Sequence, residues 1–72
     1  MLLTDADRAT EWVAKGDHAL SEARNAEAIT AYQKAIELDP ESESSHFNLA
    51  IAFTRLGKTA EAIRSYETAL RL

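Results

Sequence analysis

The chain has 72 residues, with eight Lys and Arg against twelve Asp and Glu, which gives a formal net charge of −4 at pH 7. A chain of this length holds one domain, residues 1–72, and its acidic balance without a basic stripe argues against nucleic acids and anionic membranes as partners. It has no Cys, one Pro and two Gly, which rules out a disulfide framework and is typical of a helical protein.

No apolar run approaches the length of a membrane span, and Met1-Leu2-Leu3 is far shorter than the apolar core of a signal peptide. We therefore expect a soluble protein, cytoplasmic by default.

The first predicted helix covers residues 5–22. Thr4 precedes Asp-Ala-Asp, so it is a suitable N-cap with acidic residues in the first turn. The apolar residues of this segment include Trp12, Ala19 and Leu20.

The second predicted helix covers residues 26–38, with Asn25 as its expected cap. Ala28, Ile29, Tyr32, Ala35 and Ile36 form one helical stripe. Asp39-Pro40 should end this helix, because the residue before Pro disfavours the α conformation.

The third and fourth predicted helices cover residues 43–56 and 60–71. Ser42 or Ser44 is the expected cap of the third helix, Gly57 suits a left-handed turn after it, and Thr59 is the expected cap of the fourth. Because the connections are short, successive helices should be antiparallel neighbours. The sequence therefore predicts an all-α protein.

The second and fourth helices have nearly the same sequence. AEAITAYQKAIEL begins at Ala26 and AEAIRSYETALRL begins at Ala60, an offset of 34 residues with seven of thirteen positions identical. The repeated unit is a helix pair, which buries its apolar stripe by stacking against the next pair.

The positions of small and aromatic residues resemble the tetratricopeptide repeat, a helix-turn-helix unit of 34 residues. The matching positions are Trp12, Gly16, Ala28, Tyr32, Ala35 and Pro40 in the first copy and Leu49, Ala50, Phe53, Gly57, Ala62, Tyr66 and Ala69 in the second. The resemblance implies a right-handed solenoid fragment of two stacked repeats, residues 9–42 and 43–72, after a helical extension at residues 1–8.

The small residues have a physical role in this register. Gly16 and Ala50 should allow the first helix of each pair to approach the second, with Ala28 and Ala62 opposite them. Lys15 stands where the family usually has Leu, so the first helix should be a weaker core element, helped by Leu2, Leu3 and Leu20. The fourth helix should bury Ala62, Tyr66 and Ala69 against the third.

No catalytic constellation is recognisable, so we do not expect an enzyme. His18 and His46 lack any supporting metal-ligand spacing. The acidic residues Glu37, Asp39, Glu41 and Glu43 are interpreted as a solvated run around a loop. We expect no cofactor and no metal.

The resemblance implies a protein or peptide partner bound in a concave groove lined by the first helix of each pair. In this register the lining residues are Val13, Asp17, Leu20, Ser21, Phe47, Asn48, Ile51 and Arg55. The groove is mildly apolar, which suits an amphipathic helix or a peptide with apolar anchors. The alternative is that Val13, Phe47 and Ile51 pack against one another or against the N-terminal extension.

One branch of the family clamps a terminal carboxylate, but its signature is absent here. Asn48 matches one of the clamp residues, whereas Val13 stands in place of a Lys and Asp17 in place of an Asn. Asp17 would repel a carboxylate.

The second repeat stops at Leu72, before any Asp-Pro equivalent, and no solvating helix follows. We therefore expect either a piece of a longer protein or a chain that self-associates. Ile63 and Leu70 should lie toward the position of a next repeat, where they would support a weak homodimer by stacking or helix exchange.

Overall fold

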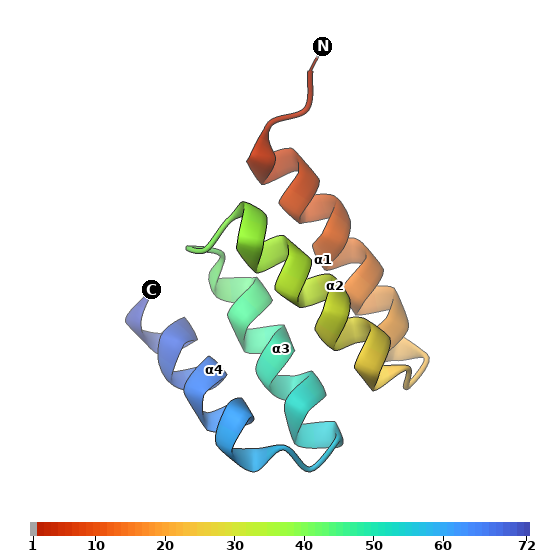
Figure 1. Ribbon diagram of the computed structural model, residues 1–72, viewed down its shortest axis with the longest axis vertical. Helices are drawn as coiled ribbons and strands as arrows, with labels where there is room; N and C mark the ends of the chain where they lie inside the picture. The colour runs from red at the N-terminus through yellow and green to blue at the C-terminus, as the bar shows by residue number, and fades with distance from the viewer. Residues whose placement is uncertain (1) are drawn as a thin grey trace.

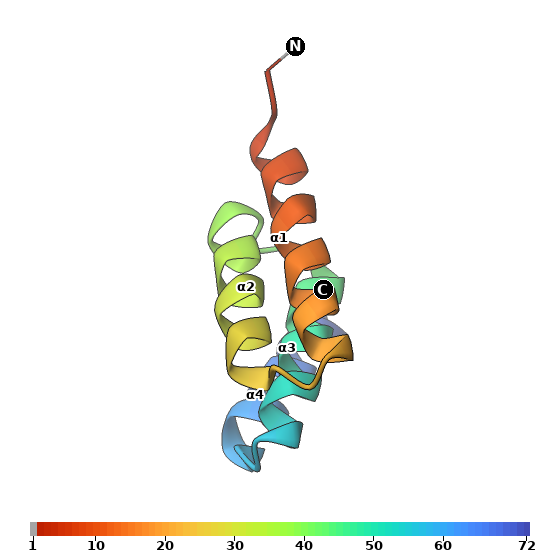
Figure 2. The ribbon, with the colours of Figure 1, turned by 90° about the vertical axis from the view of Figure 1, so that its right-hand side faces the viewer.

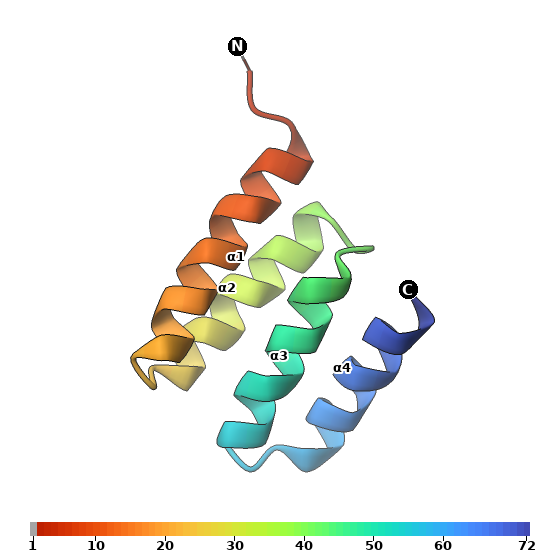
Figure 3. The ribbon, with the colours of Figure 1, turned by 180° about the vertical axis from the view of Figure 1, so that it is seen from behind.

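The computed structural model describes residues 2–72, and that part of the chain forms four α-helices. Helix α1 spans Asp5–Ser21, α2 Asn25–Leu38, α3 Glu43–Arg55 and α4 Thr59–Arg71. They lie in chain order across the molecule, with α1 and α4 at opposite ends (Figure 1, Figure 3). Contacts join α1 to α2, α2 to α3 and α3 to α4, with a smaller contact between α1 and α3. The predicted all-α fold of two helix pairs is therefore confirmed.

The predicted caps of α1 and α3 are confirmed. The Thr4 hydroxyl accepts a hydrogen bond from the Asp7 N–H at 3.1 Å, and the Asp7 carboxylate accepts one from the Thr4 N–H at 3.0 Å. This reciprocal pair satisfies two backbone donors at the helix end, and the backbone hydrogen bond from Thr4 lowers the pKa of Asp7. At α3 the Ser42 hydroxyl accepts a hydrogen bond from the Ser45 N–H at 3.4 Å.

The prediction that Asn25 and Thr59 cap α2 and α4 was wrong. Both residues are already inside their helices, and the N-caps are Arg24 and Lys58, neither of which makes a side-chain cap bond. Each of these helices therefore begins one residue earlier than the sequence predicted.

A left-handed residue lies in each of these turns. Gly57 has φ 74°, as its position predicted, and Ala23, its equivalent 34 residues earlier, has φ 59°. Gly adopts this conformation without steric cost, whereas the Cβ of Ala clashes with the following carbonyl oxygen. The backbone of the turn between α1 and α2 is therefore strained at Ala23.

The core of the first repeat is built around Tyr32, which is fully buried together with Ala28 and Ala35. Gly16 faces the ring of Tyr32, and a Cβ at Gly16 would lie only 2.6 Å from Tyr32 Cε1. The predicted close approach at Gly16 is thus formed, and Tyr32 is the side chain that requires it.

The packing of the first helix differs from prediction in one respect. Leu20 packs against the buried cluster, but Leu2 is 92% exposed and Leu3 is also exposed. The N-terminal segment runs past the end of α1 and α2 (Figure 2), so these two leucines do not reinforce the core. Lys15 is exposed, with its ammonium group 4.4 Å from the ring centroid of Trp12.

In the second repeat, Ala62 and Ala69 are buried as predicted, along with Leu49, Ala50 and Ala52. Tyr66 is only half-buried, so the prediction for this residue was too strong. Its equivalent, Tyr32, is covered because α3 packs on α2, and Tyr66 lies in the last helix of the row (Figure 1).

Candidate interaction surface

The predicted groove residues lie on two helices that contact each other. Val13, Asp17, Leu20 and Ser21 belong to α1, and Phe47, Asn48, Ile51 and Arg55 belong to α3. We call the surface formed by these eight residues the concave groove, after the groove that the sequence predicts there. Two hydrogen bonds cross it and fix one helix against the other.

The first of these bonds belongs to a polar network centred on Asp17. The Tyr32 hydroxyl donates to Asp17 Oδ1 at 2.6 Å, and Asn48 Nδ2 donates to the same oxygen at 3.2 Å. Burial raises the pKa of the Tyr32 phenol, and the hydrogen bond to Asp17 and its charge act in the same direction. The phenol therefore remains a donor at neutral pH, and Asp17 serves as an internal acceptor as well as a groove residue.

The second bond lies near the C-terminal ends of the two helices. Arg55 Nη1 donates to the backbone carbonyl oxygen of Leu20 at 2.9 Å. That carbonyl lies in the last turn of α1 and also accepts the Ala23 N–H at 3.1 Å. Arg55 therefore adds a second hydrogen bond to this acceptor and links α3 to the end of α1.

The apolar groove residues differ in how much of their side-chain surface is exposed to solvent. Val13 and Leu20 pack against the buried cluster, and Ile51 is half-buried. Phe47 is 48% exposed, and its ring meets Tyr66 edge-on with centroids 5.4 Å apart at 70°. Phe47 is thus the apolar side chain of the groove with the most accessible area.

A shallow hollow of about 460 Å³ adjoins Phe47. It is lined by Glu43, Ser44, Phe47 and Asn48, all from the first half of α3. The hollow combines an aromatic edge with an amide and a carboxylate, which gives this end of the groove both an apolar contact and hydrogen-bonding groups.

The two residues predicted for self-association are exposed on α4. Ile63 is 53% exposed and Leu70 is 87% exposed. Their equivalents in the first repeat, Ile29 and Ile36, are partly buried against the core. α4 therefore exposes two apolar side chains whose equivalents on α2 are partly covered by the second repeat.

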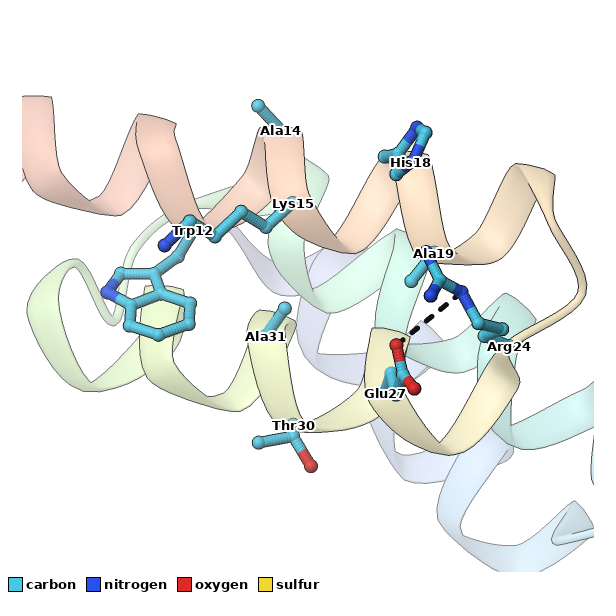
Figure 4. A pocket seen from close by; sticks show the side chains of 9 residues that line it. All are labelled: Trp12, Ala14, Lys15, His18, Ala19, Arg24, Glu27, Thr30 and Ala31. Atoms are coloured by element: carbon cyan, nitrogen blue, oxygen red, sulfur yellow. Dashed lines mark ion pairs between the residues drawn. The ribbon is translucent and has the colours of Figure 1, made fainter.

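A larger hollow, of about 610 Å³, lies between α1 and α2 on the side away from the second repeat (Figure 4). Trp12 and Lys15 line it from α1, and Arg24 and Glu27, which pair at 3.5 Å, line it from α2. A hollow of about 570 Å³ is lined by residues of α3 and α4 at equivalent positions, including His46 and Leu49, and also by Gln33, Ile36 and Glu37 of α2. Because the same helix-pair positions line both hollows, the hollow between α1 and α2 is not by itself evidence of a dedicated ligand site.

The two histidines have separate local partners. His18 Nε2 lies 3.4 Å from Glu22, and His46 Nε2 lies 3.0 Å from the Pro40 carbonyl oxygen. Across residues 2–72, no group of three His, Cys, Asp or Glu side chains is arranged to hold a metal ion. In the same range, no helix is long and apolar enough to cross a membrane.

Sequence reasoning missed the internal bonds of the groove and the strain at Ala23. Tyr32 was identified as a core residue, but nothing in its spacing indicated that its hydroxyl would reach Asp17, fifteen positions earlier. The contact between Asn48 and Asp17 spans 31 positions and depends on how the two repeats dock.

Comparison with known families gives two matches. A family model described as TPR repeat matches residues 16–57, and one described as tetratricopeptide repeat matches residues 44–72. No curated protein and no solved structure shows significant similarity to the chain.

Proposed function

Because this chain belongs to the tetratricopeptide-repeat family, whose repeats generally mediate protein–protein interactions, we propose that it binds a peptide or a partner helix in the concave groove. Modules of this family are typically non-enzymatic, and the proposed function involves no reaction. The observation that carries the proposal is the half-exposed ring of Phe47 beside Asn48 on α3.

Phe47 and Ile51 supply the apolar contact. They are four residues apart on α3, so their side chains lie on the same face one turn apart. Phe47 has more accessible area than Ile51, and an aromatic anchor of this kind usually carries a large share of the energy of a small interface. The ring is held against Tyr66, which limits the entropy lost when a partner binds.

Asn48 supplies orientation. Its amide has two N–H donors and a carbonyl oxygen, and the bond to Asp17 uses one donor. The remaining groups suit the backbone of a peptide or a polar side chain. Asp17 and Glu43 make this end of the groove acidic, which favours a neutral or basic segment over a terminal carboxylate.

The test is a peptide-display screen against the 72-residue chain, followed by titration of the tightest peptide. Phe47→Ala and Asn48→Ala should both weaken binding, with Phe47→Ala the larger, costing about 2 kcal/mol or more if it is a hot spot. Gln33→Ala is the matched control, since it removes an exposed amide from α2, outside the concave groove.

Stability must be measured alongside binding. Asn48→Ala removes the hydrogen bond to Asp17, and this loss lowers the free energy of unfolding by about 1 kcal/mol. Binding is therefore compared under conditions where circular dichroism shows every variant to be folded. A peptide that binds the two groove variants as tightly as wild type, but loses affinity for Gln33→Ala, moves the site to the outer face of α2.

A second candidate function is self-assembly. The exposure of Ile63 and Leu70 on α4 favours it, because apolar side chains on one helix face are a typical contact surface. This candidate uses a different helix from the proposed peptide contact, so the two functions are separable by mutation.

A further inference from the structure

The end of the concave groove beside Phe47 carries two carboxylates that take part in no ion pair among residues 2–72. Asp17 belongs to α1 and Glu43 to α3, and both are exposed. Glu43 lines the hollow of about 460 Å³ together with Phe47 and Asn48, and Asn48 is bonded to Asp17. We call the surface formed by these four residues the acidic end of the groove.

The Asp17 carboxylate is held in a fixed position. Its Oδ1 accepts hydrogen bonds from the Tyr32 hydroxyl at 2.6 Å and from Asn48 Nδ2 at 3.2 Å. Tyr32 is fully buried and Asn48 is half-buried, so both donors are themselves restrained. Oδ2 accepts no hydrogen bond from any residue in the described range 2–72. One oxygen therefore positions the carboxylate, and the other is available to a ligand with little further ordering.

We propose that the peptide bound in the concave groove carries a lysine whose ammonium group contacts Asp17 Oδ2 and whose aliphatic stem lies over Phe47. The inference rests on the proposed function and specifies the chemistry of the partner at the same site. A long side chain of this kind places its apolar stem on an apolar surface and its charge beside polar groups, and the acidic end of the groove offers both next to each other.

The hydrogen bonds of Asp17 favour lysine over arginine. An arginine gains most from a carboxylate when two parallel N–H groups reach both oxygens. A carboxylate oxygen has about two acceptor sites, and those of Oδ1 are already taken by Tyr32 and Asn48. A lysine ammonium is a compact charge that needs only one oxygen, so Oδ2 alone is sufficient for it.

Two further acceptors suit the remaining donors of the ammonium group. The Asn48 side-chain oxygen accepts no hydrogen bond from residues 2–72, since the bond to Asp17 uses Nδ2. Glu43 lines the same hollow as Asn48 and adds a second negative charge. An ammonium group has three N–H donors, so a lysine at this position can satisfy them with Asp17, Asn48 and Glu43.

Arg55 determines on which side of Asp17 the ammonium group is expected. It is the one basic residue among the eight that form the concave groove, and its guanidinium donates to the Leu20 carbonyl oxygen. Arg55 follows Asn48 by seven residues on α3, which corresponds to roughly 10 Å along the helix axis. Because Arg55 repels a second cation, the lysine is expected on the Glu43 side of Asn48.

The other seven Lys and Arg residues do not offset the negative charge of this end. Three are ion-paired with glutamates, two lie roughly 160–180° around α1 from Asp17, and two lie roughly 140–160° around α4 from Tyr66, the residue that contacts Phe47. The two histidines have separate partners, as described above. In that order, the seven are Arg24, Lys34 and Lys58, then Arg8 and Lys15, then Arg64 and Arg71.

The first experiment runs the peptide-display screen in parallel on the wild-type chain and on Asp17→Asn. The asparagine keeps an oxygen that can accept from Tyr32 and Asn48, and it removes the charge. The matched control is Glu11→Gln, which removes the same charge from an exposed position on the same helix, roughly 120° around α1 from Asp17. Wild type and Glu11→Gln should select a lysine beside an apolar residue, and Asp17→Asn should select the apolar residue without the lysine.

The outcomes separate this inference from the proposed function. Selected peptides that depend on Phe47 but carry no lysine overturn the inference and leave the groove as a peptide site. The same lysine selected by Asp17→Asn also overturns it. A screen that selects no peptide overturns both.

The second experiment titrates the tightest lysine-containing peptide and two derivatives of it. Replacement of the lysine by norleucine keeps the aliphatic stem and removes the ammonium group, so wild-type affinity should fall by about threefold or more, as for a charge pair near solvent. The same replacement should have a smaller effect on Asp17→Asn, because the two changes remove one contact. Replacement by arginine should weaken binding to the wild-type chain.

Equal losses for norleucine in wild type and Asp17→Asn, or tighter binding of the arginine peptide, would overturn the lysine contact. Circular dichroism establishes that each variant is folded before titration. Glu43→Gln changes an exposed residue in the first turn of α3 and provides a second variant of the same end. It should also weaken the lysine peptide, and it should leave the affinity of the norleucine peptide unchanged.

Discussion

Tyr32 connects the packing of the first repeat to the polar side of the concave groove. Its ring fills the space that Gly16 leaves open, and its hydroxyl donates to Asp17. Asp17 in turn accepts the bond from Asn48. One buried side chain therefore sets both the spacing of α1 and α2 and the orientation of the groove amide.

Gly16→Ala should destabilise the protein. Alanine normally favours a helix over glycine by about 1 kcal/mol, but the new Cβ would meet the buried Tyr32 ring at 2.6 Å. Overpacking of a tight core costs about 1–3 kcal/mol, so we expect a lower unfolding temperature. In a Tyr32→Leu background the same change should be neutral or stabilising. If Gly16→Ala raises the unfolding temperature of the otherwise wild-type chain, the contact described for Tyr32 is wrong.

Tyr32 should also make stability fall at alkaline pH. An unfolded tyrosine titrates near pH 10, and burial raises the pKa of Tyr32 in the folded protein. Above about pH 10 the unfolded chain binds fewer protons than the folded one, so the free energy of unfolding decreases as pH rises. Urea unfolding at pH 7 to 11 should show this loss, and Tyr32→Phe should have a smaller loss over the same interval. Identical pH dependence in the two proteins would contradict the assignment.

At the scale of elements, the two helix pairs are nearly equivalent but their turns are not. The turn between α3 and α4 uses Gly57, whereas the turn between α1 and α2 holds Ala23 in the same left-handed conformation. The equivalent polar caps, Arg24 and Lys58, make no side-chain cap bond in either turn. The backbone of the turn therefore determines where α2 and α4 begin.

Ala23→Gly should stabilise the protein. A left-handed conformation costs a residue with a Cβ about 1–2 kcal/mol, and part of this is offset by the larger entropy that glycine loses on folding. We expect a net gain of about 0.5–1 kcal/mol in chemical unfolding. Ala26→Gly, three residues later inside α2, is the control and should destabilise by up to about 1 kcal/mol. Destabilisation by Ala23→Gly would show that residue 23 is not left-handed.

At the scale of the whole molecule, local sequence patterns predicted the four helices and their order. The spacing of Ala28, Tyr32 and Ala35 is a property of one helix. Gly57 likewise indicates the turn between α3 and α4 from its own position in the sequence. The bonds of Asp17 to Tyr32 and Asn48 depend on how helices dock, so composition and spacing did not reveal them. The turn at Ala23 carries no glycine, and its conformation is visible only in the fold.

Local sequence patterns also could not predict how much of each apolar groove side chain is exposed to solvent. The alternatives for Val13, Phe47 and Ile51 were a binding surface or internal packing. Val13 packs against the core, Ile51 is half-buried, and Phe47 remains open. Which of these applies to each residue depends on the position of neighbouring helices, so the sequence alone left the choice undecided.

The proposed function is tested most directly by mapping where a bound peptide touches the chain. The tightest peptide from the display screen is titrated into the isotopically labelled protein while backbone amide and side-chain resonances are followed by NMR. We expect the largest shifts at Phe47, Asn48 and Ile51 on α3 and at Asp17 on α1. Shifts concentrated on the outer residues of α2, with the α3 resonances unchanged, would contradict it.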